Sequence, residues 1–128
     1  HIDYMIRYAP TLKKAKKEGK DLESLIGQFM TDNMECIEQI LKELIKCGHG
    51  IEVNSGGYLA GLSHPNPHEK ILALYHDLGG EILTIGSDAH DAINLGNAFD
   101  KLPALLQQCG FSHYTIFKDR SPVFLPLS

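Results

Sequence analysis

Apolar and polar positions follow two different periods along this 128-residue chain, and together they predict short strands separated by helices. Apolar runs bounded by glycine or polar residues predict strands at residues 50–54, 81–85 and 114–117. Apolar residues at helical spacing predict a short helix over residues 21–30 and an amphipathic helix over residues 33–47. The chain is therefore expected to mix helices and strands.

Polar residues and a proline mark the expected helix starts. Asp32 and Glu35 have the spacing of a capping box at the start of the helix over residues 33–47. Asn66 is the expected N-cap of a further helix, with Pro67 in its first turn. These signals place helix starts at positions that the structure can test.

The spacing of the strands predicts the fold class. The strands begin near residues 50, 81 and 113, roughly 31 residues apart, which is the length of a βα unit. Repeated βα units form a parallel sheet or barrel, and right-handed crossovers bring all strand carboxyl ends to one edge. We therefore predict an α/β fold in which residues 1–128 form one domain. Two prolines in the tail at residues 121–126 favour an edge strand or a loop there.

Composition limits the kinds of partner that the chain is expected to bind. Apolar residues make up 43% of the chain and charged residues 22%, and the net charge is −4. A chain without a basic surface is not expected to bind nucleic acid, and no apolar run approaches the ~20 residues of a membrane span. Three scattered cysteines are expected to be reduced, packed thiols in a cytoplasmic protein: Cys36, Cys47 and Cys109.

The candidate chemistry lies just after the strand at residues 81–85. Asp88 and His90 are one residue apart there, and in an extended chain such residues point to the same side. A carboxylate beside an imidazole at the carboxyl end of a strand suits Zn²⁺, Mn²⁺ or Fe. The alternative is an Asp that caps a helix and a loop histidine, both in solvent.

Two other polar pairs strengthen the metal interpretation. Alternating residues at the start of the chain predict the end of another strand, and residues 50–54 also end in polar side chains. Because parallel strands share one carboxyl edge, three pairs are expected to converge there: His1 with Asp3, Glu52 with Asn54, and Asp88 with His90. The two other histidines of interest, His64 and His68, flank a proline turn and are expected to be solvated or to cap a helix.

Four segments then carry a resemblance to a known family. They are His1-Ile-Asp-Tyr-Met-Ile-Arg-Tyr8, Gly50-Ile-Glu-Val-Asn-Ser-Gly56, residues 67–90 with the motif Gly86-Ser-Asp-Ala-His90, and Phe117-Lys-Asp-Arg-Ser-Pro-Val-Phe-Leu-Pro-Leu127. In these segments the chain resembles the histidinol-phosphate phosphatases of the PHP (polymerase and histidinol phosphatase) superfamily, over their C-terminal half. The chain begins at His1 without Met, and we expect an earlier part of the protein to precede it.

The resemblance implies a structure and a set of site residues. The structure would be the C-terminal half of a distorted (β/α)7 barrel with a trinuclear centre of divalent metals (Zn, Mn or Fe). His1, Asp88 and His90 resemble metal ligands, and Asp88 and His90 would take part in catalysis. Arg7 and Asn54 resemble contacts to the substrate. The loop after Asn54 lacks the basic residue that some members carry.

The resemblance also implies an activity and partners. The activity would be hydrolysis of a small phosphate ester, L-histidinol phosphate, to L-histidinol and phosphate in histidine biosynthesis. The partner of a half barrel would be its missing N-terminal half or a second copy of the chain. Two alternatives stay open: a PHP domain attached to a DNA polymerase, with an exonuclease or scaffold role, and a non-catalytic fragment of the barrel.

Overall fold

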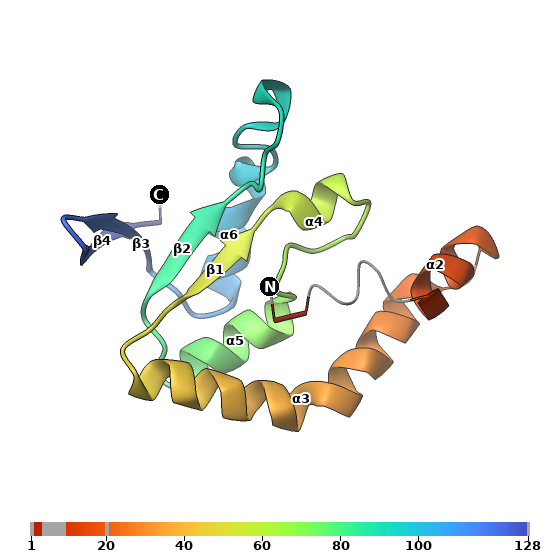
Figure 1. The fold of residues 1–128 in the computed structure, drawn as a ribbon, viewed down its shortest axis with the longest axis horizontal. Coiled ribbons are helices and arrows are strands. Elements are labelled where there is room, and N and C mark those ends of the chain that lie inside the picture. The colour runs from red at the N-terminus through yellow and green to blue at the C-terminus, as the bar shows by residue number, and fades with distance from the viewer. Residues whose placement is uncertain (1, 4–9, 20, 128) are drawn as a thin grey trace.

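The computed structural model describes residues 2–3, 10–19 and 21–127, which form both helices and strands (Figure 1). Two 3₁₀ turns, Ala92–Asn94 and Phe99–Lys101, follow the second strand. In chain order the elements are α2 (Pro10–Lys17), α3 (Leu22–Lys46), β1 (Ile51–Asn54), α4 (Gly56–Leu59), α5 (Glu69–Asp77), β2 (Leu83–Gly86), α6 (Leu102–Gln108), β3 (His113–Lys118) and β4 (Ser121–Pro126). The α/β class is confirmed.

The strands form two separate pairs. β1 and β2 are parallel, with Ile51 opposite Leu83 and Asn54 opposite Gly86, which confirms a parallel βα connection between them. β3 is not hydrogen-bonded into this ladder as the expected third parallel strand. It pairs with β4 in an antiparallel hairpin instead. It still lies beside β2, where the backbone N–H of Leu83 donates to Thr115 Oγ1 at 3.2 Å.

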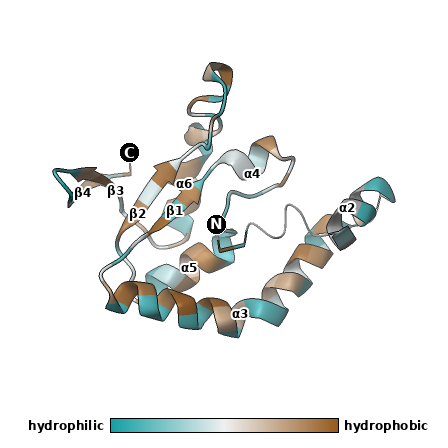
Figure 2. Ribbon diagram, in the orientation of Figure 1, coloured by the Kyte–Doolittle hydropathy of each residue, from teal (hydrophilic) through white to brown (hydrophobic). Residues whose placement is uncertain are grey.

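The core lies between the parallel pair and the helices (Figures 1 and 2). Alternation along β1 and β2 directs branched side chains toward α3, α5 and α6, where they are removed from water. The fully buried apolar residues of this core include Leu41, Val53, Ile71, Leu72, Leu83, Leu102 and Leu106. None of the helices among the described residues is long and apolar enough to cross a membrane.

The two helices predicted over residues 21–30 and 33–47 are one continuous helix, α3, so that prediction was wrong. Asp32 does not cap a helix, because its carboxylate accepts from Gln28 Nε2 within α3 at 2.6 Å. The neighbouring Thr31 and Asn33 donate to backbone carbonyls one turn earlier. These polar side chains bond inside the helix instead of ending it. The true N-cap is Asp21, which accepts from the backbone N–H of Glu23.

The expected N-cap of the helix after residue 66 was also wrong. His68 caps α5, and its Nδ1 accepts from the backbone N–H of Lys70. Asn66 instead pairs with β1, since it exchanges two backbone hydrogen bonds with Asn54. At the start of the chain, Ile2 and Asp3 lie in a turn, whereas the sequence predicted the end of a strand there.

Candidate functional site

β1 and β2 end side by side, and the residues after them form one rim. The backbone N–H of Ser55 donates to the carbonyl of Gly86 at 2.8 Å, so the chain leaves both strands at the same level. A methyl group on Gly86 would lie 2.9 Å from the carboxylate of Glu52, which therefore lies directly over the end of β2. The predicted convergence at this edge holds for these two strands.

Asn54 holds this rim together. Its Nδ2 donates to Glu52 Oε1 at 2.9 Å, and its Oδ1 accepts from the backbone N–H of Gly56 at 2.8 Å. The Asn54 side chain is buried, while Glu52 is exposed. Asn54 thus orients an exposed carboxylate and fixes the start of α4.

Asp88 also belongs to this rim, although the chain around it is not extended. A Cβ on Gly56 would lie 3.6 Å from the Cβ of Asp88, so the two loops lie close together. Asp88 has a φ of 51°, in the left-handed region, and this turns the chain away from the direction of β2. The prediction that strand alternation aims Asp88 and His90 together was therefore wrong. Both residues are exposed.

The imidazole of His90 is nevertheless arranged as a ligand. Its Nδ1 lies 2.8 Å from the backbone carbonyl of Asp88, and a carbonyl can only accept, so Nδ1 carries the proton. The lone pair of Nε2 is then free, as in metal-binding histidines whose other ring nitrogen donates to a carbonyl. Asp88 and His90 thus fit a divalent cation by their donor chemistry.

The other predicted ligand and phosphate contact are not placed. His1 and Arg7 lie outside the described residues. Within the part of the chain that is described, no three His, Cys, Asp or Glu side chains are grouped closely enough to hold a metal ion. Among the described residues, Asp88 and His90 are the predicted ligands that the structure places.

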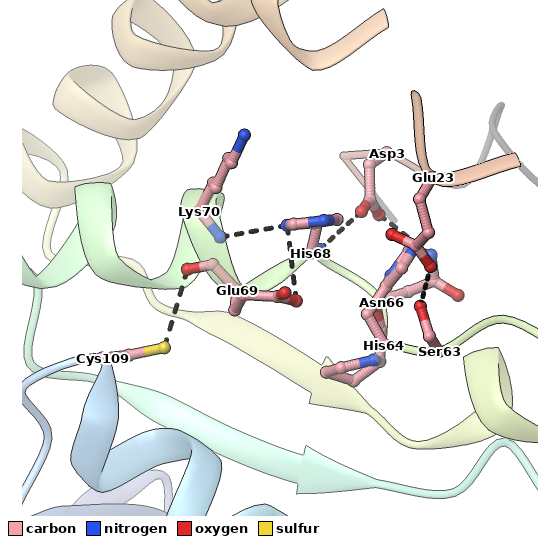
Figure 3. A network of polar contacts seen from close by, with 10 residues as sticks. Asp3, Glu23, Ser63, His64, Asn66, His68, Glu69, Lys70 and Cys109 are labelled. Carbon is pink, nitrogen blue, oxygen red and sulfur yellow. Dashed lines mark hydrogen bonds and ion pairs between the residues drawn. The ribbon is translucent and has the colours of Figure 1, made fainter. Parts of the chain in front are cut away.

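A second polar cluster lies next to the rim and was only partly expected (Figure 3). Asp3 is fully buried, and its carboxylate accepts from Asn66 Nδ2 at 3.2 Å and from the backbone N–H of His68 at 2.6 Å. His64 and His68 are also buried, with ring centroids 4.5 Å apart. The expectation that these histidines are solvated was wrong, and the expectation of a cap is confirmed for His68.

His68 is held in its neutral form. Burial lowers the pKa of its imidazole, and the negative charge of Glu69 opposes this effect only in part. His68 Nδ1 lies 3.4 Å from Glu69 Oε2, but it accepts from Lys70 N–H and so cannot also carry the proton of an ion pair. His68 is therefore a neutral acceptor at the start of α5.

Comparison with known proteins shows which proteins the chain is similar to. No protein-family model matches the chain. It is 33% identical over 116 residues to a probable histidinol-phosphatase of Thermotoga maritima, an alignment that covers 91% of this chain and 42% of the relative. It is 25% identical over 120 residues to a histidinol-phosphatase of Lactococcus lactis, covering 91% of this chain and 39% of the relative. This chain is a relative of histidinol-phosphatases.

The predicted resemblance to histidinol-phosphatases is thereby confirmed. The chain spans about two fifths of the length of these two relatives. Neither relative is named as a DNA polymerase, so the polymerase alternative gains no support. Membership of the PHP superfamily stays a prediction.

Proposed function

We propose that this chain is part of a histidinol-phosphate phosphatase, which hydrolyses L-histidinol phosphate to L-histidinol and phosphate in histidine biosynthesis. The observation that carries the proposal is the identity of 33% over 91% of the chain to a probable histidinol-phosphatase. The rim at the ends of β1 and β2 supports it, since ligands of α/β folds bind at that edge. The substrate would be a small phosphate ester in the cytoplasm.

The proposed architecture is the C-terminal half of a distorted (β/α)7 PHP barrel. Its support is the parallel pair of β1 and β2, which the helices cover on one face while Glu52 is exposed on the other. In a barrel, that second face would point inward and meet further strands. The remaining strands would come from the missing N-terminal half or from a second copy of the chain.

The proposed cofactor is a trinuclear group of divalent metals, Zn, Mn or Fe, held in this chain by His1, Asp88 and His90. Such metals, when bound, lower the pKa of water and neutralise charge on phosphoryl oxygens. His90 would offer Nε2, because its Nδ1 proton is held by the Asp88 carbonyl.

Two residues are proposed to bind the substrate. Arg7 would clamp the phosphate with two parallel hydrogen bonds, which a guanidinium group provides. Asn54 uses one Nδ2 hydrogen for Glu52, so its second Nδ2 hydrogen would serve a substrate oxygen. Asp88 would also steer or move a proton at the reacting phosphate, whereas His90 would act by holding the metal that binds the phosphate.

The test is Asp88→Asn in the full-length protein, with phosphate release from L-histidinol phosphate and metal content as readouts. Loss of a group that merely supports a ligand costs about 10–100-fold, so losing a direct ligand is expected to lower turnover by at least about 100-fold. Asp77→Asn is the matched control, because Asp77 is 78% exposed on α5, away from the rim. Turnover and metal content at wild-type levels in Asp88→Asn would contradict the assignment.

The substrate class has its own test. The wild-type full-length protein is expected to release phosphate from L-histidinol phosphate and to leave single-stranded DNA intact. Degradation of single-stranded DNA without phosphate release from histidinol phosphate would favour the polymerase-associated alternative instead.

A further inference from the structure

Asp3 has an environment that a surface turn does not need. It is 0% exposed, yet it is a carboxylate in a turn close to the start of the chain. Burying a carboxylate is costly unless donors surround it, and Asp3 has two, from Asn66 and His68. A carboxylate buried in this way is therefore expected to do more than form the turn in which it lies.

Both donors come from one loop. Asn66 and His68 lie on the loop between α4 and α5, 63 and 65 residues away in the sequence from Asp3. The neighbouring Ile2 lines a cavity of about 200 Å³ together with Glu52 and Pro67. Asp3 therefore lies beside the loop (Figure 3), and Ile2 shares a cavity with residues of β1.

The loop in turn touches the rim. Asn66 and Asn54 exchange two backbone hydrogen bonds, of 2.6 and 2.9 Å. Asn54 then binds Glu52 and the start of α4, and Gly56 packs against Asp88. Hydrogen bonds thus lead from the buried Asp3 carboxylate through Asn66 and Asn54 to Gly56, and the loop that holds the exposed Asp88 lies close to Gly56.

We propose that Asp3 is a positioning residue for the candidate site, because its carboxylate fixes the loop at residues 64–68 against the end of β1. Asp3 itself touches no substrate in this scheme. This inference rests on the proposed phosphatase function for its kinetic consequences and on geometry alone for its structural ones.

The kinetic test compares two substitutions of Asp3 in the full-length protein. Asp3→Ala removes both acceptors, and a displacement of the rim by about 1 Å can cost about 100-fold in kcat. Asp3→Asn keeps the shape: its Oδ1 can accept from His68, and its Nδ2 can donate to Asn66 Oδ1 once the Asn66 amide turns over. We expect Asp3→Asn to rescue most of the kcat lost in Asp3→Ala, with Asp77→Asn as the control.

The structural test does not depend on any substrate. We expect the backbone amides of Asn54 and Asn66 to exchange hydrogen faster in Asp3→Ala than in wild type, while amides of α3 remain unchanged. If wild type hydrolyses no histidinol phosphate, the proposed function fails and this exchange test still decides the role of Asp3. Unchanged exchange at both amides would overturn the proposal.

A third variant covers the case in which Asp3→Ala does not fold. Asn66→Ala removes one donor to Asp3 and leaves the backbone pairing with Asn54 possible. We expect a folded protein with reduced kcat and little change in KM. Wild-type kcat in folded Asn66→Ala, or in folded Asp3→Ala with only a lower Tm, would show that Asp3 contributes to stability alone and would overturn the proposal.

Discussion

At the scale of single residues, burial decides the chemistry of the loop between α4 and α5. His68 is 6% exposed and accepts the capping hydrogen bond of α5 through Nδ1. Protonation would place a hydrogen on Nδ1 and break the cap, and burial independently disfavours the charged ring. The cap at the start of α5, which lies next to Asp3, therefore forms only while His68 is neutral.

This predicts a loss of stability in mild acid. Because the pKa of His68 is lowered in the folded protein from its ordinary value of 6.5, the unfolded chain takes up a proton first as the pH falls below 6.5. The free energy of unfolding should then fall with pH, by up to about 1.4 kcal/mol per pH unit from this group. His68→Asn keeps a capping side chain that does not titrate. The unfolding free energy of this variant, measured by urea titration, should therefore fall less than that of wild type between pH 6.5 and about pH 5. Equal slopes for the two proteins would contradict this interpretation.

Burial also separates the cysteines, and here the expectation that all three are packed was wrong. Cys36 and Cys47 are exposed on or beside α3, whereas Cys109 is buried and its Sγ donates to the carbonyl of Glu69 at 3.6 Å. Burial raises the pKa of the Cys109 thiol, and the charge of Glu69 raises it further. Since the thiolate is the reactive form, Cys109 should be the least reactive.

A thiol titration checks this difference. We expect Ellman's reagent to modify Cys36 and Cys47 rapidly in the folded protein and Cys109 only after unfolding. In the variant Cys36→Ser/Cys47→Ser, the folded protein should show almost no rapid reaction. A fast-reacting thiol in that variant would mean that Cys109 is accessible.

At the scale of elements, α4 fits against the following loop only because α4 has a glycine, Gly57, where the two meet. A Cβ on Gly57 would lie 2.4 Å from the backbone carbonyl oxygen of His64 and 3.2 Å from Asn66 Oδ1. Backbone cannot move away as the end of a flexible side chain can. This contact keeps the loop that binds Asp3 close to the rim.

Gly57→Ala should therefore destabilise the protein, by about 1–3 kcal/mol, the usual cost of overpacking. Gly27 in α3 is the matched control, because a Cβ there would meet nothing within 4 Å. Gly27→Ala should stabilise by about 0.5–1 kcal/mol, since alanine favours a helix interior over glycine. Urea denaturation of both variants measures the two effects, and a neutral Gly57→Ala would show that the loop can relax.

The sequence predicted the elements that depend on local patterns. The apolar runs identified β1, β2 and β3 to within a few residues, because such runs need burial on a sheet. Local signals predicted wrong helix starts where a residue bonds within a helix or to a distant part of the chain. Asp32 looked like a cap and bonds within α3, and Asn66 looked like a cap and pairs with Asn54.

The candidate site was predictable in part for the same reason. The rim residues Glu52, Asn54 and Asp88 follow from the positions of two strand ends. The left-handed backbone of Asp88 could not be predicted in this way, because only the folded loop imposes that conformation on a residue other than glycine. The burial of Asp3 depends on partners more than 60 residues away, which no local pattern reports.

At the scale of the whole molecule, apolar side chains remain in water on two projecting parts of the structure. The segment at residues 91–99 extends away from the strands, and its Ile93 and Leu95 are 92% and 80% exposed (Figure 1). The β3–β4 hairpin exposes Phe117 and Phe124 in the same way. Exposed apolar side chains of this size on a small protein favour association.

A protein made of these 128 residues alone should therefore associate with itself. Burial of Ile93 and Leu95 against another chain would contribute roughly 1.5–3 kcal/mol for each side chain. The average mass from light scattering should rise above 14.2 kDa as concentration increases. Ile93→Lys/Leu95→Lys should lower that mass, whereas Gln39→Lys/Gln108→Lys adds the same charge at two exposed positions and should not. If both double variants reduce the mass equally, net charge rather than the apolar segment controls association, and the segment at residues 91–99 is not the contact surface.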